Sequence, residues 1–76
     1  MELPSFIKGF EEAIERPAGT TDADLPLDQI GEWDSVSVVA FIAFADLTYN
    51  AAVSADDIEK CATVRDLFET ARRRAG

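Results

Sequence analysis

The chain has 76 residues, of which 47% are hydrophobic and 29% are charged, a composition typical of one small globular domain. Its net charge is −8 with only seven Lys and Arg residues, so we expect no nucleic-acid partner, because such binding needs clustered basic side chains. The chain has no histidine and a single cysteine, Cys61, which excludes Ser–His and Cys–His catalysis, the usual zinc sites and an internal disulfide. We expect residues 1–76 to form a single domain that is not an enzyme.

The sequence also lacks the features of a secreted or membrane protein. Its first residues, MELPSF, show no basic segment followed by an apolar one, as a secretory signal would. The longest apolar run, residues 36–45, is interrupted by Ser37 and has half the length of a membrane span. We therefore expect a cytoplasmic protein with no membrane partner.

The first predicted element is a helix that starts near Pro4 and ends before Pro17, because proline suits a first helical turn and stops a helix at its end. Gly9 inside this helix costs about 1 kcal/mol relative to alanine, so the helix depends on packing. Apolar residues at helical spacing mark its buried face: Leu3, Phe6, Ile7, Phe10, Ala13 and Ile14. Three glutamates are expected on a solvated face: Glu11, Glu12 and Glu15.

Residues 16–33 are predicted to form a long ordered loop, because prolines and glycines are spread along them. Leu25, Leu27 and Ile30 are expected to anchor this loop in the core. Trp33, at its end, is expected to be a further packing anchor. A loop of this length inside a small domain often carries function.

A second helix is predicted to begin at Asp34 or Ser35, both of which are good N-cap residues, and to run to about Asn50. One apolar stripe on it is expected to face the core: Val38, Phe41, Ile42, Ala45 and Tyr49. A second apolar stripe lies beside the first: Val36, Ala40, Ala43 and Leu47. Either the long loop covers this second stripe, or the stripe is an exposed patch that partners use.

Two capping-box spacings predict the remaining helices. Ser54 and Asp57 start a short third helix, and Thr63 and Asp66 start the last one. Asp56 and Asp57 are read as helix-start charge, Cys61 as a small core residue, and Arg72, Arg73 and Arg74 as groups that oppose the last helix dipole. The predicted fold is all-α, a small four-helix bundle with three longer helices, one short helix and a long loop between the first two. The predicted core is Phe6, Phe10, Ile14, Phe41, Ala45, Tyr49, Val64, Leu67 and Phe68.

Short motifs along the chain carry a resemblance to one family. In chain order they are Leu27-x-x-Ile30, Trp33, Asp34-Ser35-Val36, Tyr49, Val53 and Thr63-Val64. With these landmarks the chain resembles the acyl carrier protein family over essentially its whole length, with Asp34-Ser35-Val36 in place of the family's Asp-Ser-Leu signature. An Asp-Ser pair alone is common and usually caps a helix. The match in length, helix order and register is what makes the resemblance specific.

The resemblance implies a modification and a role. In this family a separate magnesium-dependent transferase attaches 4′-phosphopantetheine from coenzyme A to the signature serine, which is Ser35 here, with Asp34 as its motif neighbour. The arm then holds an acyl or aminoacyl group as a thioester, and the carrier performs no chemistry itself. The implied partners are the phosphopantetheinyl transferase, a loading ligase and downstream transferases or synthases, and the implied state is a monomer.

The chain departs from the family on the partner-facing side of the second helix. Carriers in fatty acid synthesis are strongly acidic there, whereas residues 34–50 hold only Asp34 and Asp46. The partner-facing residues are instead apolar: Val36, Ala40, Ala43 and Leu47. This favours a specialised carrier in polyketide, modified-lipid, aminoacyl or surface-polymer chemistry, although peptidyl carriers usually have Gly-Gly-His-Ser at the signature. The alternative is an unmodified helical adaptor that docks a partner through the same apolar face.

Overall fold

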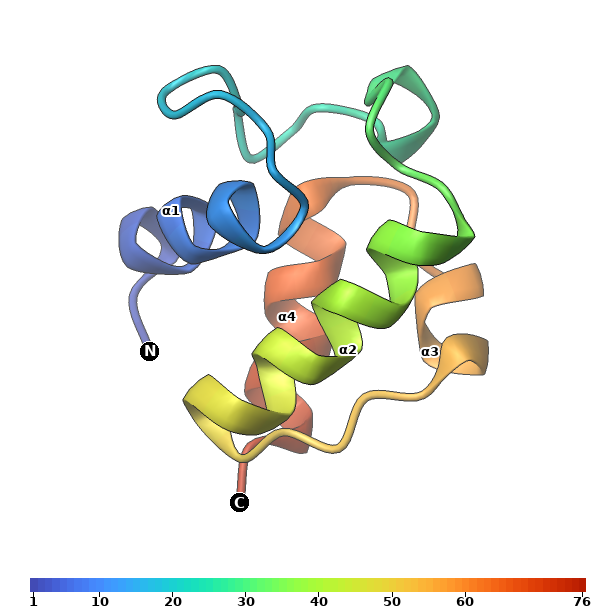
Figure 1. Cartoon of the computed structure of the whole chain (residues 1–76). Helices are drawn as coiled ribbons and strands as arrows, with labels where there is room; N and C mark the ends of the chain where they lie inside the picture. Colours follow the sequence, from blue (N-terminus) through green and yellow to red (C-terminus); the bar gives the residue numbers. More distant parts are fainter.

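The structure, a computed structural model, describes all residues from 1 to 76 and is all-α (Figure 1). Its elements are α1 (Leu3–Ala13), a short 3-10 turn η1 (Leu27–Gln29), α2 (Ser35–Tyr49), α3 (Ala55–Glu59) and α4 (Val64–Arg74). The predicted bundle of three longer helices and one short helix, with a long loop between α1 and α2, is therefore confirmed. None of the helices combines the length and the apolar character needed to cross a bilayer.

The starts of α2, α3 and α4 follow the capping residues predicted for them. In α3, Ser54 Oγ accepts from Asp57 N while the Asp57 carboxylate accepts from Ser54 N. In α4, Thr63 Oγ1 and the carboxylate of Asp66 exchange the same pair of bonds. These reciprocal bonds satisfy donors that the first turn of a helix otherwise leaves free, so each helix start is fixed by local sequence.

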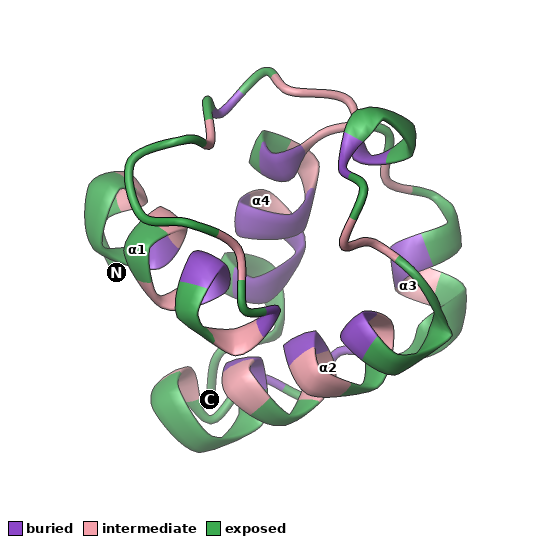
Figure 2. Ribbon diagram, turned by 45° about the horizontal axis from the view of Figure 1, so that its top comes forward, coloured by how far each residue is buried: buried purple, intermediate pink, exposed green.

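The core lies between α1, α2 and α4, and their buried faces turn toward one another (Figure 2). The ring of Phe6 is central: its centroid lies 6.0 Å from that of Phe41 and 5.3 Å from that of Phe68, both edge-to-face. Eight of the nine predicted core residues are buried. The exception is Tyr49, the last residue of α2, which is half-buried and whose ring packs on those of Phe6 and Phe44.

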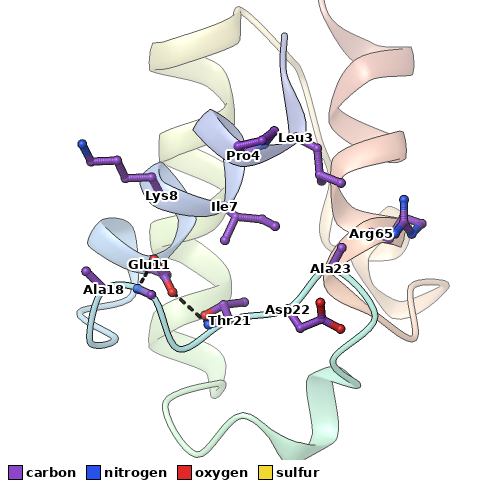
Figure 3. Close-up of a pocket in the computed structure, with 11 residues that line it drawn as sticks. Leu3, Pro4, Ile7, Lys8, Glu11, Ala18, Thr21, Asp22, Ala23 and Arg65 are labelled. Atoms are coloured by element: carbon purple, nitrogen blue, oxygen red, sulfur yellow. Dashed lines mark hydrogen bonds between the residues drawn. The ribbon is translucent and has the colours of Figure 1, made fainter.

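The prediction that Glu11 lies on a solvated face is wrong. Glu11 is 3% exposed, and its two carboxylate oxygens accept hydrogen bonds from the backbone N–H groups of Gly19, Thr20 and Thr21 at 3.0–3.1 Å. Figure 3 shows the Glu11 carboxylate turned toward this segment, with Thr21 among its partners. Burial on its own raises the pKa of this carboxyl, but the hydrogen bonds from residues 19–21 outweigh burial and lower the pKa below its ordinary value. Glu11 therefore ties the start of the long loop to α1.

The rest of the long loop is held by backbone pairing and by two ion pairs, of which one joins Asp24 to Arg65 in α4 at 3.0 Å. Leu27 N donates to Ala62 O, Val64 N to Leu25 O, and Arg65 N to Ala23 O, so residues 23–27 run beside the segment that leads into α4. Arg16 pairs with Glu32 at 2.8 Å and joins the two ends of the loop. Leu27 and Ile30 are buried and Leu25 is half-buried, which confirms the predicted anchors. The loop is ordered and delivers residues 33–35 to the start of α2.

Candidate functional site

The candidate site is the first turn of α2, which carries two serines in different environments. Asp34 is the N-cap, and its Oδ1 accepts from Ser37 N at 2.9 Å. Ser37 Oγ accepts from Asp34 N at 2.6 Å and donates to Asp34 O at 2.9 Å, and the residue is 5% exposed. Ser35, the first helical residue, is exposed and its hydroxyl makes no hydrogen bond within the protein. Of these two serines, only Ser35 has a hydroxyl that is free to react with a group brought from solution.

The backbone around Ser35 offers hydrogen-bond donors as well. Asp34 N and Ser37 N are taken by the capping bonds, whereas the N–H groups of Ser35 and Val36 have no acceptor in the protein. Such free N–H groups, with the partial positive charge of a helix N-terminus, favour an anion at this position. A phosphate joined to Ser35 Oγ would be next to them.

A hollow of about 610 Å³ opens beside Ser35, between the long loop, α2 and α3. Its lining is mostly apolar, with Trp33 and Val38 on one side and Ile58 on the other. The Trp33 ring lies 5.8 Å from that of Phe10 and 6.3 Å from that of Phe41, so Trp33 is the predicted packing anchor.

Cys61 lines the same hollow but is half-buried rather than a core residue. Its Sγ lies 3.4 Å from both Asp57 O and Thr70 Oγ1. Burial is the largest influence on this thiol and raises its pKa, so Cys61 is an ordinary packed thiol rather than an activated nucleophile.

The outer side of α2 is an exposed apolar surface. Val36 is 75% exposed and Leu47 is 84% exposed, so the long loop does not cover the second stripe. Ala43 is exposed too, whereas Ala40 is half-buried. Val39, which the sequence had not assigned to either stripe, is 66% exposed. We call this surface the apolar α2 face: Val36, Val39, Ala40, Ala43 and Leu47.

Carboxylates border the apolar α2 face at its Ser35 end. A hollow of about 480 Å³ between the end of α1 and the start of α2 is lined by Glu15, Glu32 and Asp34 beside Val36 and Ala40. Along the helix the next acidic residue is Asp46. The face is thus apolar in its middle and negative at both ends.

Two ion pairs lie away from this site, near the C-terminal end of the chain. Asp57 pairs with Arg74 at 2.9 Å, and this contact, with the Ser54 N–H bond, lowers the pKa of Asp57 to about 2. Arg72 pairs with Glu69 at 2.7 Å in the last turn of α4. No group of three His, Cys, Asp or Glu side chains is arranged to hold a metal ion.

The sequence analysis did not assign two residues to the site, Val39 and Ser37. Val39 follows Ser35 by four residues, so helical spacing places the two on the same face of α2. Every residue from 38 to 45 is apolar, however, so the sequence pattern does not show which of them are exposed. The role of Ser37 is visible as a capping box with its usual residue types exchanged, with the acid at the N-cap and the hydroxyl three residues later.

A comparison with solved structures bears on the fold. The fold is similar to the solution structure of a holo acyl carrier protein from Geobacter metallireducens, with a TM-score of 0.77, 17% sequence identity, and coverage of 97% of this chain and 86% of that one. No protein-family model matches the sequence, and none of the curated proteins matches it. The chain has the fold of an acyl carrier protein.

Proposed function

We propose that this protein is a carrier that holds an acyl or aminoacyl group as a thioester on a 4′-phosphopantetheine arm attached to Ser35. The observation that supports it most directly is an exposed serine, free of internal hydrogen bonds, at the first position of α2 in an acyl carrier protein fold. The structural neighbour is a holo carrier, which is consistent with such an arm.

The residues present fit the group. The free N–H groups of Ser35 and Val36 would face the phosphodiester, and the helix N-terminus favours its negative charge. The hollow beside Ser35 supplies apolar wall against which the arm can lie. When bound, the arm supplies a thiol that forms the thioester, and the chain itself positions the arm and leaves its serine accessible. Tethering raises the effective concentration of the cargo at each partner enzyme.

The partners in this proposal are the phosphopantetheinyl transferase, a loading ligase and downstream transferases or synthases. The apolar α2 face begins one residue after Ser35 and is exposed, so it is the surface on which these enzymes would dock. Docking there would bury apolar surface, and each Å² removed from water contributes about 25 cal/mol of favourable free energy. We further propose that residues 1–76 act as a single, monomeric cytoplasmic domain.

The same face supports a proposal about the kind of pathway that the carrier serves. Because the middle of α2 has no charged residue between Asp34 and Asp46, we propose a specialised carrier of lipid or secondary-metabolite biosynthesis rather than a carrier of general fatty acid synthesis. An apolar docking face suits partners with an apolar recess in place of a basic patch.

A second candidate function is supported by the exposure of Val39 and Leu47. An unmodified adaptor could dock a partner helix on the apolar α2 face alone, and Ser35 would then only follow the helix cap.

Intact mass separates the two. Purified apo protein is incubated with coenzyme A, magnesium and a broad-specificity phosphopantetheinyl transferase, and a known carrier serves as positive control. The carrier proposal predicts a gain of one phosphopantetheine group. An unchanged mass, while the positive control is fully converted, would support the adaptor and reject the carrier.

A further inference from the structure

The structure assigns a positioning role to Ser37: its buried hydroxyl locks the peptide unit that presents Ser35 to the transferase. This inference rests on the proposed function and adds to it a residue that never touches the arm. Four hydrogen bonds around Asp34 carry it. Ser37 Oγ accepts from Asp34 N at 2.6 Å and donates to Asp34 O at 2.9 Å, Asp34 Oδ1 accepts from Ser37 N at 2.9 Å, and Val38 N donates to Asp34 O at 2.9 Å.

One geometric fact links these bonds to the reactive residue. Asp34 C=O and Ser35 N–H belong to the same planar peptide unit, so a contact that fixes the carbonyl also fixes the direction of the N–H. The Ser37 hydroxyl holds that carbonyl and the N–H group on the other side of Asp34 at the same time. It therefore sets both peptide units that lead into Ser35.

The other capping boxes of the protein do not do this. At the equivalent position, α3 has Asp57 and α4 has Asp66, whose carboxylates accept from the N-cap N–H but have no proton to donate to the carbonyl. Only the box at the start of α2 has a hydroxyl there, which both accepts and donates.

Burial separates this role from docking. Ser37 is 5% exposed, so a partner cannot contact it appreciably, whereas Val36 and Val39 beside it are exposed. Loss of the hydroxyl should loosen the first turn of α2 without changing the apolar α2 face. The expected signature is a lower kcat for phosphopantetheine transfer with KM for the carrier unchanged.

The test compares Ser37→Thr and Ser37→Val, which are isosteric with each other. Both carry a γ-methyl group that serine lacks, and Val has a second methyl group where Thr keeps the hydroxyl. Transfer from coenzyme A by a broad-specificity transferase is followed by intact mass. The Thr variant should react at the wild-type rate. The Val variant should lose about fivefold in kcat, the factor expected for a helix cap of typical strength, with KM within about twofold of wild type. Amide exchange of Val38 should quicken in the Val variant alone.

Asp66→Ala is the matched control, because it removes the corresponding member of the α4 capping box and leaves the start of α2 intact. It should lower the melting temperature to a degree similar to Ser37→Val and leave kcat unchanged. Equal kcat for the Thr and Val variants would overturn the inference while the proposed function stands, as would a raised KM with unchanged kcat. A wild type that takes up no arm would instead reject the proposed function itself.

Discussion

The ring of Phe44 in α2 lies directly over Gly9 in α1. A β-carbon at position 9 would stand 2.5 Å from Cε1 and 2.7 Å from Cζ of that ring, closer than real side-chain contacts allow. The same ring packs on Phe6, with centroids 5.8 Å apart, and on Tyr49, at 5.6 Å. The glycine thus lets α1 and α2 approach, and it places the helix that carries Ser35 against the core.

Gly9→Ala should therefore destabilise the protein, although alanine is the better helix former. Helix propensity favours alanine by about 1 kcal/mol, whereas overpacking of a core contact costs roughly 1–3 kcal/mol. We expect a net loss near 1 kcal/mol in urea unfolding. In a Phe44→Leu background, where the ring is gone, the same substitution should be neutral or stabilising. A gain in stability from Gly9→Ala alone would show that the ring moves aside without cost.

Phe41 is fully buried between the rings of Phe6, Phe10 and Trp33. Phe41→Ala should cost on the order of 3–5 kcal/mol, which is a large share of the stability of a domain of this size. Val39→Ala, on the exposed side of the same helix, should change stability by less than about 0.5 kcal/mol. Equal melting temperatures for Phe41→Ala and wild type would contradict the assignment of the buried face of α2.

Glu11→Gln replaces an acceptor of three N–H groups with an amide that must turn one of its own N–H groups toward them. We expect a loss of roughly 1.5–3 kcal/mol, the range for hydrogen bonds to charged groups. The control is Glu12→Gln on the exposed side of α1, which should be nearly silent. If both variants unfold at the same urea concentration, the carboxylate does not hold the loop.

Acid should weaken the protein through the same group. The folded-state pKa of Glu11 lies below the ordinary 4.5, so its contribution is fully present above pH 4.5 and is lost as pH falls through the lower folded value. Asp57 acts in the same direction, with its pKa lowered from 3.8 to about 2. Unfolding free energy measured between pH 6 and pH 2 should decline in wild type and decline less steeply in Glu11→Gln. Parallel curves for the two proteins would exclude Glu11 as a source of the decline.

The exposed apolar α2 face predicts a recognition mode that depends little on salt. Val39→Glu and Leu47→Glu should slow modification of Ser35 by the transferase and leave the fold intact by circular dichroism. Thr48→Glu, exposed on α2 but off the face, is the matched control. Apolar burial is insensitive to ionic strength, whereas exposed charges are screened beyond about 8 Å at 0.15 M salt. A steep fall of the rate with salt, and silent glutamate variants, would assign recognition to acidic residues outside the face.

Local sequence rules predicted the fold well, because caps and periodicity are local. Three helices begin directly after a capping residue whose side chain accepts a hydrogen bond from a free N–H group of the first turn: Asp34, Ser54 and Thr63. The long loop is held by the contact of the Glu11 carboxylate with the backbone of residues 19–21, and hydrophobic periodicity cannot predict such a contact. Glu11 is four residues after Ile7 and three before Ile14, so it lies on the buried side of α1, but nothing local shows that a distant backbone segment would pair with its charge.

The part of the site that local sequence determines was predictable, and the part that depends on tertiary packing was not. The motif placed Ser35 at a helix start, and the exposed position of that serine follows from helix geometry. The contact of Phe44 with Gly9 and the exposure of Val39 depend on which side of α2 packs on α1. That side is determined by tertiary packing and not by local sequence. In a helix that is apolar on nearly all sides, periodicity alone leaves that choice open.

The central claim is that Ser35, and not Ser37, receives the arm, and peptide mapping after transfer tests it most directly. Wild type, Ser35→Ala and Ser37→Ala are each incubated with coenzyme A and a broad-specificity transferase, digested, and sequenced by tandem mass spectrometry. We predict one phosphopantetheine on Ser35 in wild type, none in Ser35→Ala, and slowed but complete modification of Ser35 in Ser37→Ala. An arm found on Ser37, or on any residue of Ser35→Ala, would contradict the account.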